Sequence, residues 1–183
     1  MVTKVRATIE DLYKIREGGK AEIVDGEIVR IMPTGRKPGR ASLKIVFSLH
    51  KHELTSAGGY ALGDNVGFIV DLPNRNSFSP DAAWYVGSVE SMEFLSGEPA
   101  FAAEVRSSDG YGQKAELAQA EKRRDYFKAG TLVVWDVDLL SDDVIRVYRS
   151  ADPSTPTIYR RGEIAEAEPA VLGWTVPVGD LFT

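Results

Sequence analysis

The sequence SPDAAWYV at residues 79–86, PAFAAEVR at 99–106 and YGQKAELAQAEKRRDYFKA at 111–129 decides the fold of this chain. Small, aromatic and β-branched residues dominate the first run, and its proline stands near the beginning, where a strand tolerates it. The second run alternates its side chains between two faces, which indicates another strand. The third run repeats its apolar residues with helical spacing. Together they predict a mixed α/β (α+β) domain in which helices cover a central sheet.

Two carboxylates occupy distinctive positions in the predicted strands. In the second run Phe101, Ala103 and Val105 share one face, and Glu104 is a lone carboxylate on the other, near the end of an apolar strand. Asp81 stands where the first strand opens. Carboxylates on adjacent strands of one sheet can lie close enough to hold a divalent cation such as Mg²⁺ through oxygen ligands.

A lysine lies inside the apolar stripe of the predicted helix. At about 100° per residue, Lys122 falls on the same narrow stripe as Ala115, Ala118 and Tyr126. A lysine among such residues either extends its ammonium group to solvent or points at an anionic partner. Lys122 is therefore a candidate for a site that handles negative charge.

These residue types favour metal-assisted hydrolysis of a phosphodiester. A cation held by Asp81 and Glu104 would polarise a phosphoryl oxygen and lower the pKa of a bound water, and Lys122 would orient that water or stabilise developing charge. This chemistry needs no nucleophilic side chain. The sequence contains no cysteine, which excludes thiol catalysis and thiolate metal sites.

The same segments carry a family resemblance that covers nearly the whole chain. They are PD at 80–81, EVRS at 104–107, KRRDY at 122–126, AG at 129–130, VWDVD at 134–138 and AEIVDGE at 21–27. The pattern resembles the bacterial Uma-type family of restriction-endonuclease-like proteins in the PD-(D/E)XK nuclease superfamily. That resemblance implies a restriction-endonuclease-like core with a mixed central β-sheet flanked by helices, preceded by an N-terminal helix and a β-hairpin. It also implies Asp81 and Glu104 as metal ligands and Lys122 as the catalytic lysine.

Two positions depart from the family pattern. The superfamily places a lysine two residues after the second acid, where this chain has Arg106, and the lysine looks to have moved to Lys122 on the following helix. Family members often carry a histidine at the start of the helix after the hairpin, where this chain reads GRAS at 39–42. No residue of this chain is therefore predicted to take the role of that histidine.

The remaining elements are predicted from local signals. Asp25-Gly26 between two apolar runs indicates a hairpin turn. The apolar face of a following helix is predicted from residues that recur at helical spacing, namely Leu43, Val46, Phe47, His50 and Leu54. Residues 33–39 and 72–77 are predicted as loops, and residues 161–183 as a segment along the outside. His50 is interpreted as a packing residue rather than a ligand.

Two further carboxylates are weaker candidates. Glu22 resembles a family position that is usually acidic, but an exposed strand carboxylate is the preferred interpretation because exposure is the rule for glutamate. Glu53, near the end of the predicted helix, is a possible extra acid. Neither is assigned a role.

Composition restricts the class of protein. With 183 residues, 43% hydrophobic content and no Ser/Gly linker, residues 1–183 fit one domain with a single core. No apolar segment is long enough to cross a bilayer and no signal-peptide pattern opens the sequence, so we expect a cytoplasmic protein without a membrane partner. The net charge of −5 opposes tight general binding to nucleic acid, although a local basic cluster can suffice.

Two hypotheses follow. The first is an endonuclease that uses Mg²⁺ (or Mn²⁺) to hydrolyse DNA, with Asp81, Glu104 and Lys122 as its catalytic residues. The second is a non-catalytic scaffold that keeps the nuclease fold and binds nucleic acid or a protein partner. A homodimer is compatible with the first hypothesis, because two sites related by a two-fold axis can cut both strands of a duplex.

Overall fold

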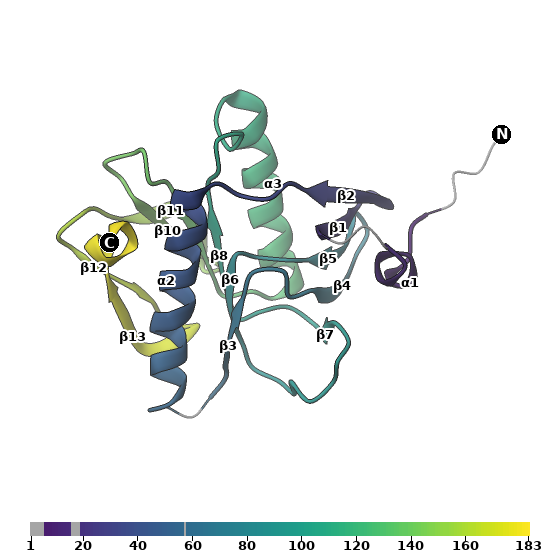
Figure 1. The fold of residues 1–183 in the computed structure, drawn as a ribbon, viewed down its shortest axis with the longest axis horizontal. Helices are drawn as coiled ribbons and strands as arrows, with labels where there is room; N and C mark the ends of the chain where they lie inside the picture. Colours follow the sequence, from purple (N-terminus) through teal and green to yellow (C-terminus); the bar gives the residue numbers. More distant parts are fainter. Residues whose placement is uncertain (1–5, 16–18, 57) are drawn as a thin grey trace.

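The computed structural model describes residues 6–15, 19–56 and 58–183, and Figure 1 shows their arrangement. The helices are α1 (Ile9–Tyr13), α2 (Arg36–Glu53), α3 (Gln113–Ala129) and the closing 3₁₀ helix η1 (Val178–Phe182). The strands are β1 (Lys20–Val24), β2 (Glu27–Ile31), β3 (Tyr60–Gly63), β4 (Phe68–Leu72), β5 (Arg75–Phe78), β6 (Ala82–Tyr85), β7 (Leu95–Ser96), β8 (Phe101–Val105), β9 (Val133–Val137), β10 (Ile145–Arg149), β11 (Asp152–Tyr159), β12 (Ile164–Ala167) and β13 (Val171–Pro177).

A six-stranded mixed sheet lies at the centre of the molecule. Its strand order is β11-β10-β9-β8-β6-β3, in which β8 and β9 run parallel and the other neighbours run antiparallel. Helix α2 packs on one side of this sheet, and α3 lies on the other side (Figure 1). The predicted α+β fold with a mixed central sheet flanked by helices is therefore confirmed.

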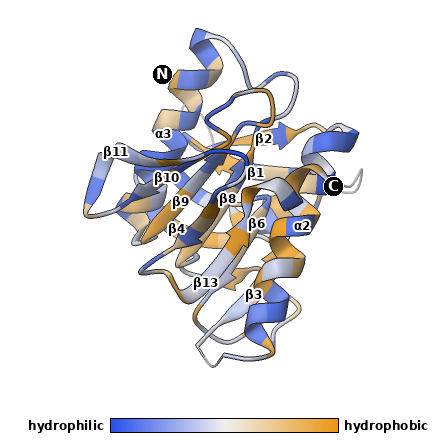
Figure 2. Ribbon diagram, turned by 90° about the vertical axis from the view of Figure 1, so that its left-hand side faces the viewer, coloured by the Kyte–Doolittle hydropathy of each residue, from blue (hydrophilic) through white to orange (hydrophobic). Residues whose placement is uncertain are grey.

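Strand β8 separates two hydrophobic layers, as its alternation predicts. Phe101, Ala103 and Val105 belong to the larger layer, which also contains the buried residues of α2 and β13. Ala102 faces the smaller layer with Tyr126 of α3. Figure 2 shows hydrophobic residues gathered in the central strands between the two layers. Glu104 points to the α3 side, where it lies among polar groups instead of apolar ones.

A five-stranded sheet stands beside the central one and carries the N-terminal hairpin. Its order is β2-β1-β5-β4-β7. Between β1 and β2, Asp25 has φ of 52° and Gly26 has φ of 74°, the positive values that a tight two-residue hairpin turn requires. The hairpin predicted from Asp25-Gly26 is thus confirmed, and β1 joins β5 through Val24 and Arg75.

Three segments differ from the sequence prediction. Residues 72–77 are not a loop, because β4 and β5 pair through a turn at Pro73-Asn74. Residues 33–39 are only partly a loop, since α2 begins at Arg36. Pro38 lies in the first turn of this helix, where proline is tolerated because a backbone N–H there has no partner within the helix. Residues 161–183 do not lie along the outside, because Trp174 and Leu181 are each 2% exposed in the core.

Helix α2 buries a different face from the one predicted. Ala41, Ser42, Ile45 and Leu49 face the sheet, whereas Leu43, Phe47, His50 and Leu54 are exposed. Of the predicted face, Val46 is partly buried and packs against the core. The buried stripe begins with small residues, which let the helix backbone approach the sheet closely. In the described part of the chain, no helix combines the length and apolar character needed to cross a membrane.

Candidate active site

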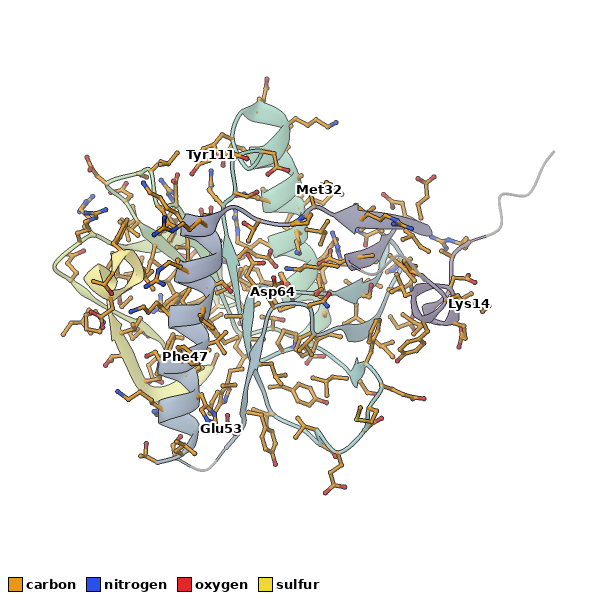
Figure 3. All side chains as sticks on the ribbon, viewed as in Figure 1. Lys14, Met32, Phe47, Glu53, Asp64 and Tyr111 are labelled. Carbon is orange, nitrogen blue, oxygen red and sulfur yellow. The ribbon has the colours of Figure 1, made fainter. Side chains whose placement is uncertain are left out.

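A cleft of about 740 Å³ opens between the β1–β2 hairpin, helix α3 and the ends of β6 and β8. Its lining includes Glu22, Asp81, Glu104 and Lys122. Asp64, in the turn after β3, also lines this cleft and lies near the centre of the view in Figure 3. The structure therefore brings all three predicted catalytic residues into one cavity.

Asp81 is fixed against strand β8 directly before β6 begins. Its backbone N–H donates to the carbonyl of Ala103 at 3.0 Å, and its Oδ2 accepts the N–H of Val105 at 2.8 Å. The hydroxyl of Ser42 on α2 donates to the Asp81 carbonyl at 2.7 Å. These hydrogen bonds hold the backbone of Asp81 and one of its carboxylate oxygens. The other oxygen, Oδ1, is left to contact groups in the cleft.

Glu104 and Lys122 meet across the cleft. The Lys122 Nζ lies 2.8 Å from Glu104 Oε1, and the Tyr126 hydroxyl donates to the same oxygen at 2.7 Å. Lys122 and Tyr126 are four residues apart on α3, so they project from one side of the helix toward β8. The helical stripe predicted from the sequence accounts for this contact.

The charges in the cleft shift the pKa values of both partners. Burial raises the pKa of Glu104, and the neighbouring charge of Asp81 adds to this effect although Lys122 opposes it. Burial alone would lower the pKa of Lys122, but the charges of Glu104 and Glu22 outweigh it and raise that pKa. Lys122 is thus an ammonium group at neutral pH, suited to donating hydrogen bonds rather than to removing a proton.

Glu22 is buried, so the preferred interpretation of it as an exposed carboxylate is wrong. Its Oε1 lies 2.8 Å from Lys122 Nζ and accepts the backbone N–H of Ser79 at 2.9 Å. Its Oε2 lies 2.7 Å from the guanidinium of Arg75. Burial raises the pKa of Glu22, but the charges of Lys122 and Arg75 outweigh that effect and lower it. Glu22 therefore joins the hairpin to Lys122 and to the segment before Asp81.

Arg106 does not reproduce the superfamily's lysine. Its Nε and one terminal nitrogen donate to the two oxygens of Asp136 on β9, each at 2.7 Å, and the guanidinium also pairs with Glu116 of α3. The hydrogen bonds to Asp136 outweigh burial and raise the pKa of Arg106. This side chain joins β8, β9 and the start of α3.

The other polar candidates lie outside the cleft. Glu53 accepts the backbone N–H of Ala61 at 2.8 Å at the far end of α2, well separated from Asp64 in Figure 3. His50 is exposed and pairs with Glu53 at 3.4 Å, so the interpretation of His50 as a packing residue is wrong. Neither residue takes part in the candidate site.

Lys20 is a member of the site that the sequence pattern does not predict. Its Nζ lies 2.7 Å from Asp81 Oδ1 and 2.8 Å from Asp64 Oδ1. Its partners are more than 40 residues away in sequence, so no local pattern indicates these contacts. One signal was available: Lys20 and Glu22 are two residues apart on β1 and therefore share a face of that strand.

The donor set fits a divalent cation that takes part of its coordination from water or substrate. Tyr126 and Lys122 both contact Oε1 of Glu104, and Asp81 Oδ1 already holds a cation, the Lys20 ammonium. Within the described ranges, no group of three or more His, Cys, Asp or Glu side chains forms a metal site alone. Mg²⁺ commonly binds through one or two carboxylates together with water and phosphate oxygens.

The family model Uma2, described as "Putative restriction endonuclease", matches residues 7–179. The chain belongs to the Uma2 family. A solved structure from Anabaena variabilis ATCC 29413, described as "a putative nuclease belonging to DUF820", is similar with a TM-score of 0.73. The two are 16% identical, and the match covers 96% of this chain and 97% of that one, which shows a shared fold. No curated protein matched this Uma2 sequence.

Proposed function

We propose that this chain hydrolyses phosphodiester bonds in DNA with the help of Mg²⁺ or Mn²⁺ bound by Asp81 and Glu104. One observation carries the proposal: the Lys122 ammonium lies 2.8 Å from Glu104 in the cleft that also contains Asp81. Two carboxylates beside a fixed positive charge match what phosphoryl chemistry needs, because charge grows on the phosphate in the transition state. Membership of the Uma2 family supports the nuclease class.

Each residue has a distinct part in this proposal. The cation would act as a Lewis acid and lower the pKa of a bound water. Lys122 donates a hydrogen bond to the phosphate or to the attacking water, and its raised pKa keeps it protonated for that task. Tyr126 holds Glu104 by donating to Oε1, and Glu22 holds Lys122 from the other side. Binding, orientation and charge stabilisation are thereby divided among separate side chains.

The choice of DNA rests on the family description. With a net charge of −5, the chain depends on local features for any contact with a phosphate backbone. A cytoplasmic location and a homodimer that cuts both strands remain predictions. Gel filtration with light scattering, with and without a short duplex, measures the second of these directly.

A nicking assay on supercoiled plasmid tests the catalytic proposal. Wild-type protein should nick DNA only with Mg²⁺ or Mn²⁺, and Asp81→Asn, Glu104→Gln and Lys122→Met should each reduce the rate at least a hundredfold. Glu53→Gln is the matched control, because it removes a carboxylate outside the cleft and should retain wild-type activity. Wild-type protein that is inert on every DNA and RNA form tested, or Asp81→Asn protein that still cleaves, would contradict the proposal.

A scaffold without catalysis is the second candidate. The observation that favours it is that both acids already have ammonium partners, Lys20 at Asp81 and Lys122 at Glu104. Calorimetric titration of Mg²⁺ into wild type and Asp81→Asn separates the two candidates. A nuclease should bind Mg²⁺ and lose that binding in Asp81→Asn, whereas a scaffold should show no binding that depends on Asp81.

A further inference from the structure

We propose that Lys20 is a built-in competitor for the catalytic cation: its ammonium occupies Asp81 Oδ1 in the resting protein and leaves when a divalent cation binds. This inference rests on the proposed function, since it concerns the same carboxylates. It assigns Lys20 and Asp64 a task in setting cation affinity.

The geometry at Asp81 places the Lys20 ammonium and a divalent cation in competition for one carboxylate oxygen. Oδ2 of Asp81 accepts the Val105 N–H at 2.8 Å, so Oδ1 is the oxygen left for a cation in the cleft. The Lys20 Nζ lies 2.7 Å from that oxygen. A divalent ion bound to Oδ1 would stand within a few ångströms of the ammonium, where two like charges repel strongly in a partly buried site.

The surroundings of Lys20 favour its resting position on the carboxylates. Its side chain is 11% exposed, and burial by itself would lower its pKa. The charges of Asp81 and Glu104 outweigh this effect and raise the pKa, so Lys20 is charged at neutral pH. The ammonium therefore supplies the positive charge that the acids of the cleft need when no divalent cation is bound.

Asp64 gives the displaced ammonium a second partner. Its Oδ1 lies 2.8 Å from Lys20 Nζ, and its side chain is 50% exposed at the edge of the cleft. The four-carbon stem of lysine is flexible, so the ammonium can leave Asp81 while keeping its contact with Asp64. In that position Lys20 would still line the cleft that contains Lys122.

A calorimetric titration of Mg²⁺ into wild type, Lys20→Gln and Arg123→Gln tests the proposal without measuring catalysis. Loss of the competitor should lower the Kd of Lys20→Gln at least tenfold. Arg123 lines the same cleft but stacks on Tyr148, with 3.6 Å between its guanidinium carbon and the ring centroid. Arg123→Gln removes one positive charge without freeing Asp81, so its Kd should stay within threefold of wild type.

A second measurement follows Lys20 itself. The side-chain ¹⁵N signal of Lys20, identified by its loss in Lys20→Gln, should shift on Mg²⁺ addition with the same midpoint as the heat signal. Lys20→Met is a second neutral variant that keeps the length of the apolar stem, and it replaces Lys20→Gln if circular dichroism shows that the latter is unfolded.

The outcomes separate this inference from the proposed function. If wild type binds Mg²⁺ and the neutral variants bind it equally or more weakly, Lys20 is not a competitor, although the cation site stands. If neither wild type nor the neutral variants bind Mg²⁺ or Mn²⁺, both proposals fall together.

Discussion

Glu22 shows at the level of one residue how the site depends on a buried charge. It contacts Lys122 of α3, Arg75 of β5 and the backbone of Ser79 before Asp81. These partners come from α3 and from β5 with the residue that follows it, and Glu22 itself comes from β1. The position of Lys122 is therefore set as much by the hairpin as by its own helix.

Glu22→Gln should lower the free energy of unfolding by about 3 kcal/mol at pH 7, because it leaves two buried cations without their shared carboxylate. The pKa of Glu22 is lowered in the folded protein, so its stabilising effect is complete above the ordinary glutamate pKa of about 4.3 and is lost as the pH falls through the lower folded value. Urea unfolding of wild type and Glu22→Gln at pH 7, 5 and 3.5 measures this. A stability difference that stays constant or widens toward pH 3.5 would contradict it.

Arg106→Lys tests whether the superfamily's lysine position is open to catalysis. Lysine cannot reproduce the two parallel hydrogen bonds to Asp136, so we expect a loss of about 2 kcal/mol in the free energy of unfolding. The Mg²⁺ affinity should be unchanged. A variant with wild-type stability and faster plasmid nicking would show that this position belongs to the reaction instead.

Local sequence patterns predict some residues of the site and not others. Asp81, Glu104 and Lys122 are visible in the sequence because each interrupts or opens an apolar run. The burial and the ion pairs of Lys20, Glu22 and Arg75 are not visible, because their partners lie more than 40 residues away in the sequence. Burial of a charge depends on those partners, and no property of the local segment reveals it.

The same contrast holds for elements. The hairpin at Asp25-Gly26 follows from a turn that needs positive φ at both positions, which is a strictly local requirement. The buried face of α2 does not follow from helical periodicity, because the helix offers two apolar stripes. The sheet that α2 contacts selects the stripe with small residues, and that sheet is assembled from later parts of the chain.

A matched pair of leucines tests the assignment of the α2 face. Leu49→Ala should cost about 3 kcal/mol in the free energy of unfolding, because Leu49 is fully buried and its truncation leaves a cavity. Leu43→Ala should change it by no more than about 0.5 kcal/mol, because Leu43 is 49% exposed. Both values come from urea unfolding curves. Equal losses in the two variants would mean that the exposed stripe is covered in solution.

At the scale of the whole molecule, the larger core is closed by the C-terminal segment. Trp174 of β13 stacks on Trp135 of β9 with 5.0 Å between ring centroids, and its indole N–H donates to Ser48 of α2 at 3.0 Å. Val176 and Leu181 fill the same layer. Its proline and glycine residues predict a segment along the outside, but its alternating apolar residues complete the core.

Trp174→Ala should lower the free energy of unfolding by about 4 kcal/mol, because it removes a large ring that is 2% exposed and leaves the Ser48 hydroxyl without its donor. Thermal and urea unfolding followed by far-UV circular dichroism measure the loss. Trp174→Phe is the control, and it should lose less because it keeps the stacking with Trp135. A Trp174→Ala protein as stable as wild type would show that the Trp174 ring does not stabilise the core.

The contact between Trp174 and Ser48 spans 126 residues of sequence. During synthesis, a nascent chain would expose the apolar faces of α2, β8 and β9 until the C-terminal segment that covers them has been made. Sequence-distant contacts of this kind slow folding. We therefore expect the chain to complete its fold only after residues 171–182 have left the ribosome. Until then, we expect chaperones to bind its exposed apolar surface.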